Sequence, residues 1–291
     1  MKIETYLQKH YTKETTKAYK REIEIYLSNN PSAKKYVYAQ IVNHIGSIRK
    51  RYKNVNTISR MVSAMKVYYD YLCNAGLRKD NPSKSIQLRD KISRDIQLQD
   101  LFTTVELEML MNRKDFHFNL VCRNKVLMSL LIYQGLRPKE MEALQQKDIN
   151  LLDGSIYIRA TARTNSRTLT LKPNQILLFQ EYLTSTRSNL LKANESDYFL
   201  IGERGNAMIG EDVTKHAKRI GKTKPFGKLD SRKINVMTIR QSVITNLLKQ
   251  NNDLRIVQTF AGHKYPSTTE RYRQSNVEAL QSAINQYHPM K

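Results

Sequence analysis

Two arginines, a histidine and a tyrosine in the second half of the 291-residue chain have the side-chain types needed to break a phosphodiester bond without a metal ion. Such a reaction needs a side chain that attacks phosphorus and then holds it covalently. It also needs cations that offset the charge of the transition state, and an acid that protonates the departing sugar oxygen. A planar guanidinium suits non-bridging phosphate oxygens better than an ammonium does.

The two arginines lie in separate short motifs. In Gly-Leu-Arg-Pro-Lys-Glu, Gly135 ends one predicted helix and Pro138 begins the next. Arg137 is therefore expected at a helix N-terminus, where anions bind well. In Met-Thr-Ile-Arg-Gln, Arg240 is expected in the first turn of an amphipathic helix. Taken singly, an arginine beside a helix start is more often an ordinary surface residue.

The histidine and the tyrosine share one motif, Ala-Gly-His-Lys-Tyr-Pro-Ser-Thr-Thr-Glu-Arg-Tyr. Gly262 places His263 just past a predicted helix end, and Tyr272 follows nine residues later at the end of a short helix. Either residue alone has a plain structural explanation, since histidines cap and pack and the chain has 17 tyrosines. The order of the three motifs carries more information than any one of them.

A helical first domain is predicted for residues 1–88. One amphipathic segment is capped by Thr12 and ends at Asn30-Pro31. A second starts near Ser32, and a third runs from about Thr57 to Gly76. A polar, charged stretch follows, and residues 89–101 are interpreted as a linker.

The second domain is predicted to span residues 102–291. Thr103 and Glu106 form a capping box, and the apolar helix of about residues 119–134 is expected to be its core. Residues 155–159 and 167–172 read as two strands of a hairpin, and the remainder as helices for which Thr238, Asp253 and Ser267 are candidate N-caps. The predicted fold class is mainly α with a small antiparallel β-sheet.

The charge of the chain indicates a polyanionic partner. Forty-nine Lys and Arg against 26 Asp and Glu leave a formal charge of +23, which self-repulsion makes costly unless a partner uses it. Double-stranded DNA is the expected partner. The basic stretches proposed to bind it contain Arg49, Lys50, Arg51 and Lys53 in the first domain and Lys215, Lys218, Arg219, Lys222 and Lys224 in the second. The alternative is that these stretches are merely solvated.

Several features bound the class of protein further. No apolar run is long enough to span a membrane, and the N-terminal segment lacks a signal peptide. Two isolated cysteines, Cys73 and Cys122, fit reduced thiols, so a cytoplasmic location is expected. Neither a phosphate-binding Gly-rich loop nor a metal-ligand cluster is found, so no metal or cofactor is expected.

The order and spacing of the three motifs resemble those of the tyrosine recombinase (phage-type integrase) family over nearly the whole chain. The resemblance implies a helical DNA-gripping domain followed by a catalytic domain. It implies that Arg137 and Arg240 clamp the scissile phosphate, that His263 donates a hydrogen bond to it, and that Tyr272 attacks it. The product would be a 3′-phosphotyrosyl link and a free 5′-hydroxyl. Members work as homo-tetramers on two DNA sites, so an integrase or site-specific recombinase of this assembly is expected. The amphipathic segment from Val277 to Tyr287 either docks on a neighbouring subunit or packs on its own domain.

Two positions depart from the family pattern. Met237 stands where a histidine or lysine is usual, and a thioether neither accepts nor releases a proton. In the hairpin, the family's lysine acid aligns with Arg163, and a guanidinium donates a proton poorly. Arg167, or a lysine from residues 221–228, is the alternative.

These departures leave two hypotheses open: a slower recombinase, and a catalytically weak or silent DNA-binding relative. The retention of both arginines, His263 and Tyr272 favours the first. A topoisomerase-like enzyme of the same chemistry is disfavoured by the small two-domain layout. A basic RNA-binding module accounts for the charge but not for the motifs.

Overall fold

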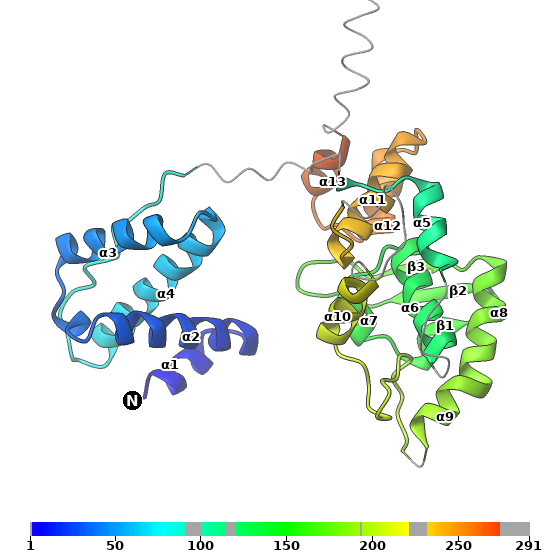
Figure 1. The fold of residues 1–291 in the computed structure, drawn as a ribbon, viewed down its shortest axis with the longest axis horizontal. Helices are drawn as coiled ribbons and strands as arrows, with labels where there is room; N and C mark the ends of the chain where they lie inside the picture. Colours follow the sequence, from blue (N-terminus) through cyan, green and yellow to red (C-terminus); the bar gives the residue numbers. More distant parts are fainter. Residues whose placement is uncertain (1, 91–99, 114–119, 193, 221–231, 274–291) are drawn as a thin grey trace, which may run out of the picture. The chain divides into compact units, whose positions relative to one another are not determined.

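The computed structural model describes residues 2–90, 100–113, 120–192, 194–220 and 232–273. The chain divides into two compact units, residues 1–94 and 95–291 (Figure 1). The predicted fold class is confirmed, because the described residues form helices and one antiparallel three-stranded sheet. Most of the predicted linker, residues 89–101, lies outside the described residues, so its boundaries stay a prediction.

The described part of the first unit is a bundle of four α-helices. These are α1 (Ile3–His10), α2 (Lys13–Asn29), α3 (Tyr38–Arg51) and α4 (Val55–Asn74). Thr12 caps α2 as predicted, because its side chain accepts a hydrogen bond from the backbone N–H of Thr15. The prediction missed the short α1, and α3 begins later than expected because residues 33–35 form a separate 3₁₀ turn.

Apolar and tyrosine side chains fill the bundle. Leu7 and Ile41 are fully buried, and the hydroxyl groups of Tyr26 and Tyr69 lie 2.8 Å apart. Tyr69 also donates to the carbonyl of Ala33, so its buried hydroxyl has partners. Burial, together with the hydrogen bond to Tyr69, raises the pKa of Tyr26 far above its ordinary value. Both phenols are therefore neutral structural groups.

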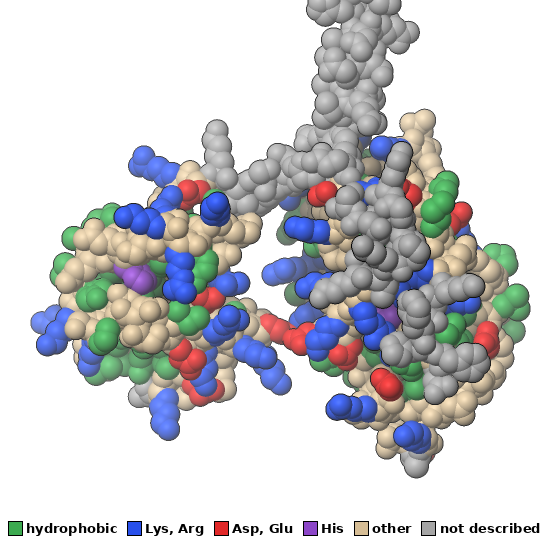
Figure 2. Space-filling model, viewed as in Figure 1, with side chains coloured by type: hydrophobic (Ala, Val, Ile, Leu, Met, Phe, Trp, Pro, Cys, Tyr) green, Lys and Arg blue, Asp and Glu red, His purple; other side chains and the backbone are tan. Residues whose placement is uncertain are grey.

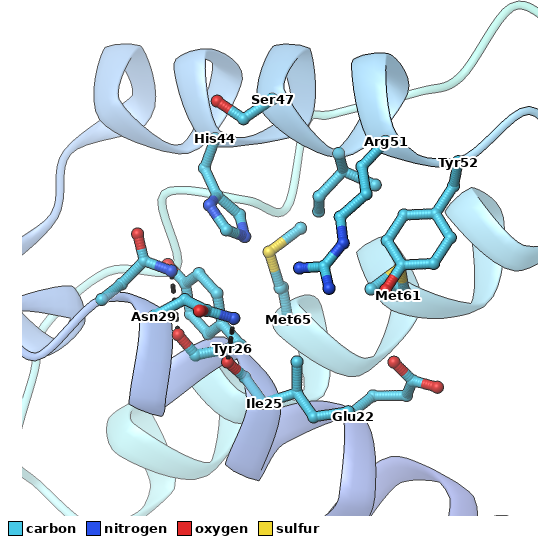
Figure 3. Close-up of a pocket in the computed structure, with 12 residues that line it drawn as sticks. Glu22, Ile25, Tyr26, Asn29, His44, Ser47, Arg51, Tyr52, Met61 and Met65 are labelled. Atoms are coloured by element: carbon cyan, nitrogen blue, oxygen red, sulfur yellow. Dashed lines mark hydrogen bonds between the residues drawn. The ribbon is translucent and has the colours of Figure 1, made fainter.

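A pocket of about 320 Å³ lies among α2, α3 and α4 (Figure 3). Met61 and Met65 contribute apolar surface, while Glu22, His44 and Arg51 contribute polar groups. The Arg51 side chain extends from the end of α3 over this pocket, with its guanidinium carbon 5.6 Å from the ring centre of Tyr52. Part of its length therefore covers apolar surface.

The second unit surrounds one apolar helix with shorter elements. They are α5 (Thr104–Met111), α6 (Val121–Tyr133), α7 (Pro138–Glu142), β1 (Ile149–Asn150), β2 (Ser155–Ile158), β3 (Arg167–Thr170), α8 (Pro173–Glu181), α9 (Arg187–Leu191), α10 (Gly210–Ile220), α11 (Val236–Lys249), α12 (Leu254–Ala261) and α13 (Pro266–Arg273). Helix α6 is the predicted central helix, and α5, α8 and α11 pack around it. Its leucines are buried on several faces, which explains why its sequence is apolar rather than amphipathic.

The sheet and the helix caps agree in part with prediction. Strands β2 and β3 pair antiparallel, with Ile156 opposite Leu169, but the two-residue β1 was not predicted. Thr103 caps α5 and Asp253 caps α12 as expected. Thr238 was wrong as a cap, because the side chain of Asn235 accepts from the N–H groups of Met237 and Thr238 and starts α11 earlier. Likewise α13 begins at Pro266, before the predicted cap at Ser267. Among the described helices, none has the length and apolar character to cross a bilayer.

Candidate active site

Arg240 lies at the centre of the predicted site. It is 4% exposed, and its guanidinium donates to the carbonyls of Gly135 and Ala261. The same group lies 3.3 Å from Nε2 of His263. Burial and the charge of nearby Arg137 lower the pKa of Arg240 to about 10, so it remains a cation at neutral pH. This one side chain therefore joins the end of α6, the end of α12 and the histidine.

Arg137 occupies the N-cap position of α7, as predicted. Its side chain is half-buried, and its charge lowers the pKa of both Arg240 and His263. Gly135 precedes it with a φ of +58°, a conformation that L side chains rarely adopt. Because Gly135 adopts this conformation, the chain turns at the end of α6. Arg137 then lies near enough to Arg240 for its charge to lower the pKa of Arg240.

The carboxylate of Glu140 lies close to Arg137, Arg167 and Arg240. Glu140 is 3% exposed, and its carboxylate accepts hydrogen bonds from the backbone N–H of Arg137 at 2.9 Å and from both terminal nitrogens of Arg167 at 2.9 and 3.1 Å. Nη1 of Arg240 lies 4.0 Å away. Burial alone would raise the pKa of Glu140, but the bonds and charge of Arg167 lower it overall. No role was predicted for Glu140 from the sequence, where its only signal was its place in the motif of Arg137.

His263 follows Gly262, which ends α12 in the left-handed conformation with a φ of +66°. This agrees with the predicted helix end. His263 is 2% exposed, and its Nδ1 lies 2.8 Å from the hydroxyl of Thr269. Burial and the charge of Arg240 lower the pKa of His263 to about 3. The imidazole is therefore neutral at physiological pH, and Thr269, which sequence reasoning missed, orients it.

Tyr272 lies on α13 beside His263. The two ring centres are 6.0 Å apart, with the ring planes inclined by 19°. The tyrosine ring packs against the small apolar cluster of Ile244, Val257 and Ala261. Burial raises the pKa of Tyr272, and the positive charges of Arg240 and Arg137 oppose that rise. The phenol is thus protonated at neutral pH, and the two guanidinium charges offset part of the cost of forming its anion.

The hairpin loop between β2 and β3 contacts the turn that carries His263. Thr164 forms a β-bridge with His263, and the N–H of Asn165 donates to the carbonyl of Gly262 at 3.0 Å. Arg163, the predicted lysine replacement, is exposed at this loop. The alternative, Arg167, is 5% exposed and bound to Glu140. The lysines of residues 221–228 lie outside the described residues.

Met237 lies three positions before Arg240 on α11. Its side chain is 62% exposed, and its backbone N–H is bound by the cap residue Asn235. The altered family position therefore presents a thioether to solvent beside the site. Such a group offers neither a proton nor a strong hydrogen-bond acceptor.

The residues proposed to bind DNA occupy different environments. Arg49 forms two hydrogen bonds with Asp90, at 2.8 and 2.5 Å, and Arg51 covers the pocket of the first unit. Like these two arginines, Lys50, Lys53, Lys215, Lys218 and Arg219 are exposed. Lys222 and Lys224 lie outside the described residues. Figure 2 shows Lys and Arg side chains spread over the visible face of each unit, with fewer Asp and Glu.

The depressed pKa of His263 predicts a pH dependence of stability. Its pKa of about 3 in the folded chain lies below the ordinary 6.5, so the unfolded chain binds more protons between these values. Stability is therefore full above pH 6.5 and falls as the pH drops towards 3. The melting temperature of the wild type should fall more steeply between pH 7 and 5 than that of His263→Asn. Parallel pH profiles would contradict this assignment.

The sequence of the chain matches a family of known proteins. Residues 100–279 match the model described as "Phage integrase family". The chain is 27% identical over 282 residues to tyrosine recombinase XerD of Oceanobacillus iheyensis, covering 94% of this chain and 92% of that protein. It is 24% identical over 298 residues to tyrosine recombinase XerD of Staphylococcus haemolyticus, covering 99% and 98%.

Solved structures share the fold. A crystal structure of XerH site-specific recombinase bound to palindromic difH substrate, a post-cleavage complex, aligns with a TM-score of 0.69 at 21% identity, covering 90% of this chain and 76% of that one. A lambda integrase dimer bound to a COC′ core site aligns with a TM-score of 0.67 at 14% identity, covering 94% and 75%. The matched family spans the catalytic unit from α5 to beyond α13. The chain therefore belongs to the phage integrase family, the tyrosine-type site-specific DNA recombinases.

Proposed function

We propose that Tyr272 cleaves and rejoins duplex DNA at a specific site through a 3′-phosphotyrosyl intermediate. One observation carries this proposal. Arg240, His263 and Tyr272 come from α11, from the turn after α12 and from α13, yet they form one connected cluster. A buried cation beside a neutral imidazole and a phenol is costly to assemble, and the proposed reaction uses all three groups.

The proposed chemistry conserves every atom. The phenolic oxygen of Tyr272 forms a bond to phosphorus while the bond from phosphorus to the 5′ oxygen breaks. Arg137 and Arg240 stabilise the extra negative charge on the non-bridging oxygens. His263 donates one hydrogen bond to them as the neutral tautomer with its proton on Nε2, while Nδ1 accepts from the hydroxyl of Thr269. The phenol proton passes to solvent, and the 5′ oxygen takes up a proton as it leaves. Rejoining reverses these steps, so no ATP or metal ion is required.

Protonation of the leaving 5′ oxygen is the step that these side chains support least, since neither Met237 nor the buried Arg167 supplies a proton. Arg163 is an exposed basic residue of the hairpin loop, and its loop is bound to the His263 turn through Thr164. We assign Arg163 to steady the departing oxygen while water protonates it. Cleavage would then be slower than with a general acid, whose help is worth roughly 10²–10⁴-fold.

A leaving-group role for Arg163 predicts a specific rescue. Arg163→Ala should slow cleavage about tenfold or more, because charge on the 5′ oxygen is no longer offset. A DNA whose scissile phosphate carries sulfur in place of the bridging 5′ oxygen needs no such help, since a thiolate leaves easily. The variant and the wild type should therefore cleave the sulfur substrate at the same rate. An equal defect on both substrates would rule out this role for Arg163.

Covalent trapping tests the proposed function directly. Labelled DNA flanking the gene, nicked so that a cleaved end diffuses away, is incubated with the purified protein. A protein–DNA adduct that survives denaturation is the expected result. Tight DNA binding without any adduct would instead favour the catalytically silent DNA-binding relative, for which the exposed Met237 and the missing hairpin lysine are the supporting observations.

The proposal extends to assembly and to domain roles. Residues 1–88 grip DNA together with the exposed lysines of α10, residues 89–101 link the domains, and residues 102–291 catalyse. Four subunits act on two DNA sites in the cytoplasm. The apolar spacing of Val277, Leu280 and Ile284 in the sequence supports docking between subunits, as does an apolar pocket of about 290 Å³ among α5, α6, α11 and α12. Sedimentation of the protein with DNA carrying one or two sites measures the assembly, and a two-site complex with fewer than four subunits would contradict it.

A further inference from the structure

Building on the proposed function, we propose that Arg167 is a positioning residue that holds Glu140 away from Arg240 and so keeps the charge of Arg240 available to the substrate phosphate. The family resemblance pointed to the hairpin for a general acid, and Arg167 was an alternative for that role. The structure assigns it a different one. It does not contact the reacting atoms, and it acts through Glu140.

The two terminal nitrogens of Arg167 form a buried, bidentate ion pair with Glu140. Both side chains of the Arg167–Glu140 pair are 1% exposed, and the two oxygens of the carboxylate each accept from one terminal nitrogen. Such a fork-to-fork geometry is the strongest form of this pair. The same carboxylate lies 4.0 Å from Nη1 of Arg240, so it has a second cation within reach.

Competition between the two arginines follows from this arrangement. If Arg167 were neutral, Glu140 would keep its hydrogen bond from the backbone N–H of Arg137, and Arg240 would be the cationic side chain left beside it among the described residues. A closer Glu140–Arg240 pair would cancel charge that the phosphate needs and would pull Arg240 from the carbonyls of Gly135 and Ala261. The ion pair between Arg167 and Glu140 prevents both effects. Burying the additional cation of Arg167 carries a desolvation penalty, which the carboxylate of Glu140 offsets.

Arg167 also packs against the turn that carries His263. A Cβ atom added at Gly262 would lie 2.5 Å from Nη1 and 3.0 Å from Cζ of Arg167. The guanidinium therefore lies directly against the glycine that ends α12. This contact and the hydrogen bond from the N–H of Asn165 to the carbonyl of Gly262 connect β3 to the His263 turn. The Arg167–Glu140 pair connects β3 to α7. Arg167 is thus placed to affect both Arg240 and His263 without touching DNA.

Three variants and one control separate a charge-holding role from a merely structural one. Arg167→Gln lowers the charge of the cluster by one unit and frees Glu140, so adduct formation at saturating DNA should slow by about 10²-fold. Glu140→Gln in the same chain removes the competing carboxylate and restores the charge balance. The double variant should therefore recover at least about tenfold of the lost rate. Arg167→Lys keeps the charge with poorer geometry and should fall between the wild type and Arg167→Gln.

Arg187→Gln is the matched control. Arg187 is buried and donates to the carbonyls of Ser196 and Tyr198, and its helix α9 lies at the end of the catalytic unit opposite α13 (Figure 1). It should lower thermal stability without changing the cleavage rate per folded molecule, measured by single-turnover adduct formation well below the melting temperature. DNA affinity should be similar in all variants.

The outcomes are distinguishable. A double variant as slow as Arg167→Gln, or an Arg167→Gln variant as fast as the wild type, would overturn the role of Arg167 while leaving the proposed function intact. If Arg167→Gln does not fold, the comparison of Arg167→Lys with the double variant decides, since a structural role predicts that only the lysine variant cleaves. Absence of an adduct with the wild type would instead remove the proposed function, and the role of Arg167 with it.

Discussion

Replacing Tyr272 with phenylalanine is expected to abolish the covalent protein–DNA adduct while leaving DNA binding intact. The substitution removes only the phenolic oxygen, which is the atom proposed to attack phosphorus. The ring still packs against Ile244, Val257 and Ala261, so the free energy of unfolding should change by less than about 1.5 kcal/mol. Denaturing gel electrophoresis with nicked, labelled DNA measures the adduct, and fluorescence anisotropy measures the affinity.

Tyr265→Phe is the matched control for this experiment. Tyr265 lies seven residues before Tyr272 on the same segment and is 70% exposed. It loses the same atom from the same residue type, so its adduct yield should equal that of the wild type. An adduct in the Tyr272→Phe variant, or its loss in Tyr265→Phe, would assign the nucleophile elsewhere.

Replacing Arg240 with lysine is expected to slow cleavage by roughly 10²–10³-fold, the usual loss when a donor to a developing oxyanion is removed. A lysine keeps the positive charge but cannot reach the carbonyls of Gly135 and Ala261 while also facing a phosphate. Each buried carbonyl left without a donor should lower the free energy of unfolding by about 1–3 kcal/mol. Single-turnover adduct formation and thermal unfolding measure the two effects.

Arg187→Lys serves as the comparison, because Arg187 is also a buried arginine that donates to backbone carbonyls. It should lose stability but cleave normally per folded molecule. A similar cleavage rate for Arg240→Lys and Arg187→Lys would show that the geometry of Arg240 is not used in catalysis. The pair of variants thus separates what a buried arginine does for stability from what this one does for the phosphate.

Local sequence patterns predicted much of the fold because their causes are local. The apolar run of α6, the capping box of Thr103 and Glu106, and the left-handed glycine before His263 each depend on residues within a few positions of one another. The same patterns failed where two local solutions compete. Both Asn235 and Thr238 can cap a helix, and in the structure Asn235 is the cap while Thr238 is buried within the first turn.

Three ordered motifs were enough to predict the family, the fold class and the four residues proposed to act on the phosphate, because their order restricts both the chemistry and the path of the chain. How those residues are held became apparent from the packing of the folded chain. The Glu140–Arg167 pair joins residues 27 positions apart, and the contact of Thr164 with His263 crosses from the hairpin to the end of α12. Such pairs leave no periodic signal, because packing of distant elements brings them together. For the same reason the sequence could not tell that Arg167, at the start of β3, is buried against Glu140 while Arg163, in the preceding loop, is exposed.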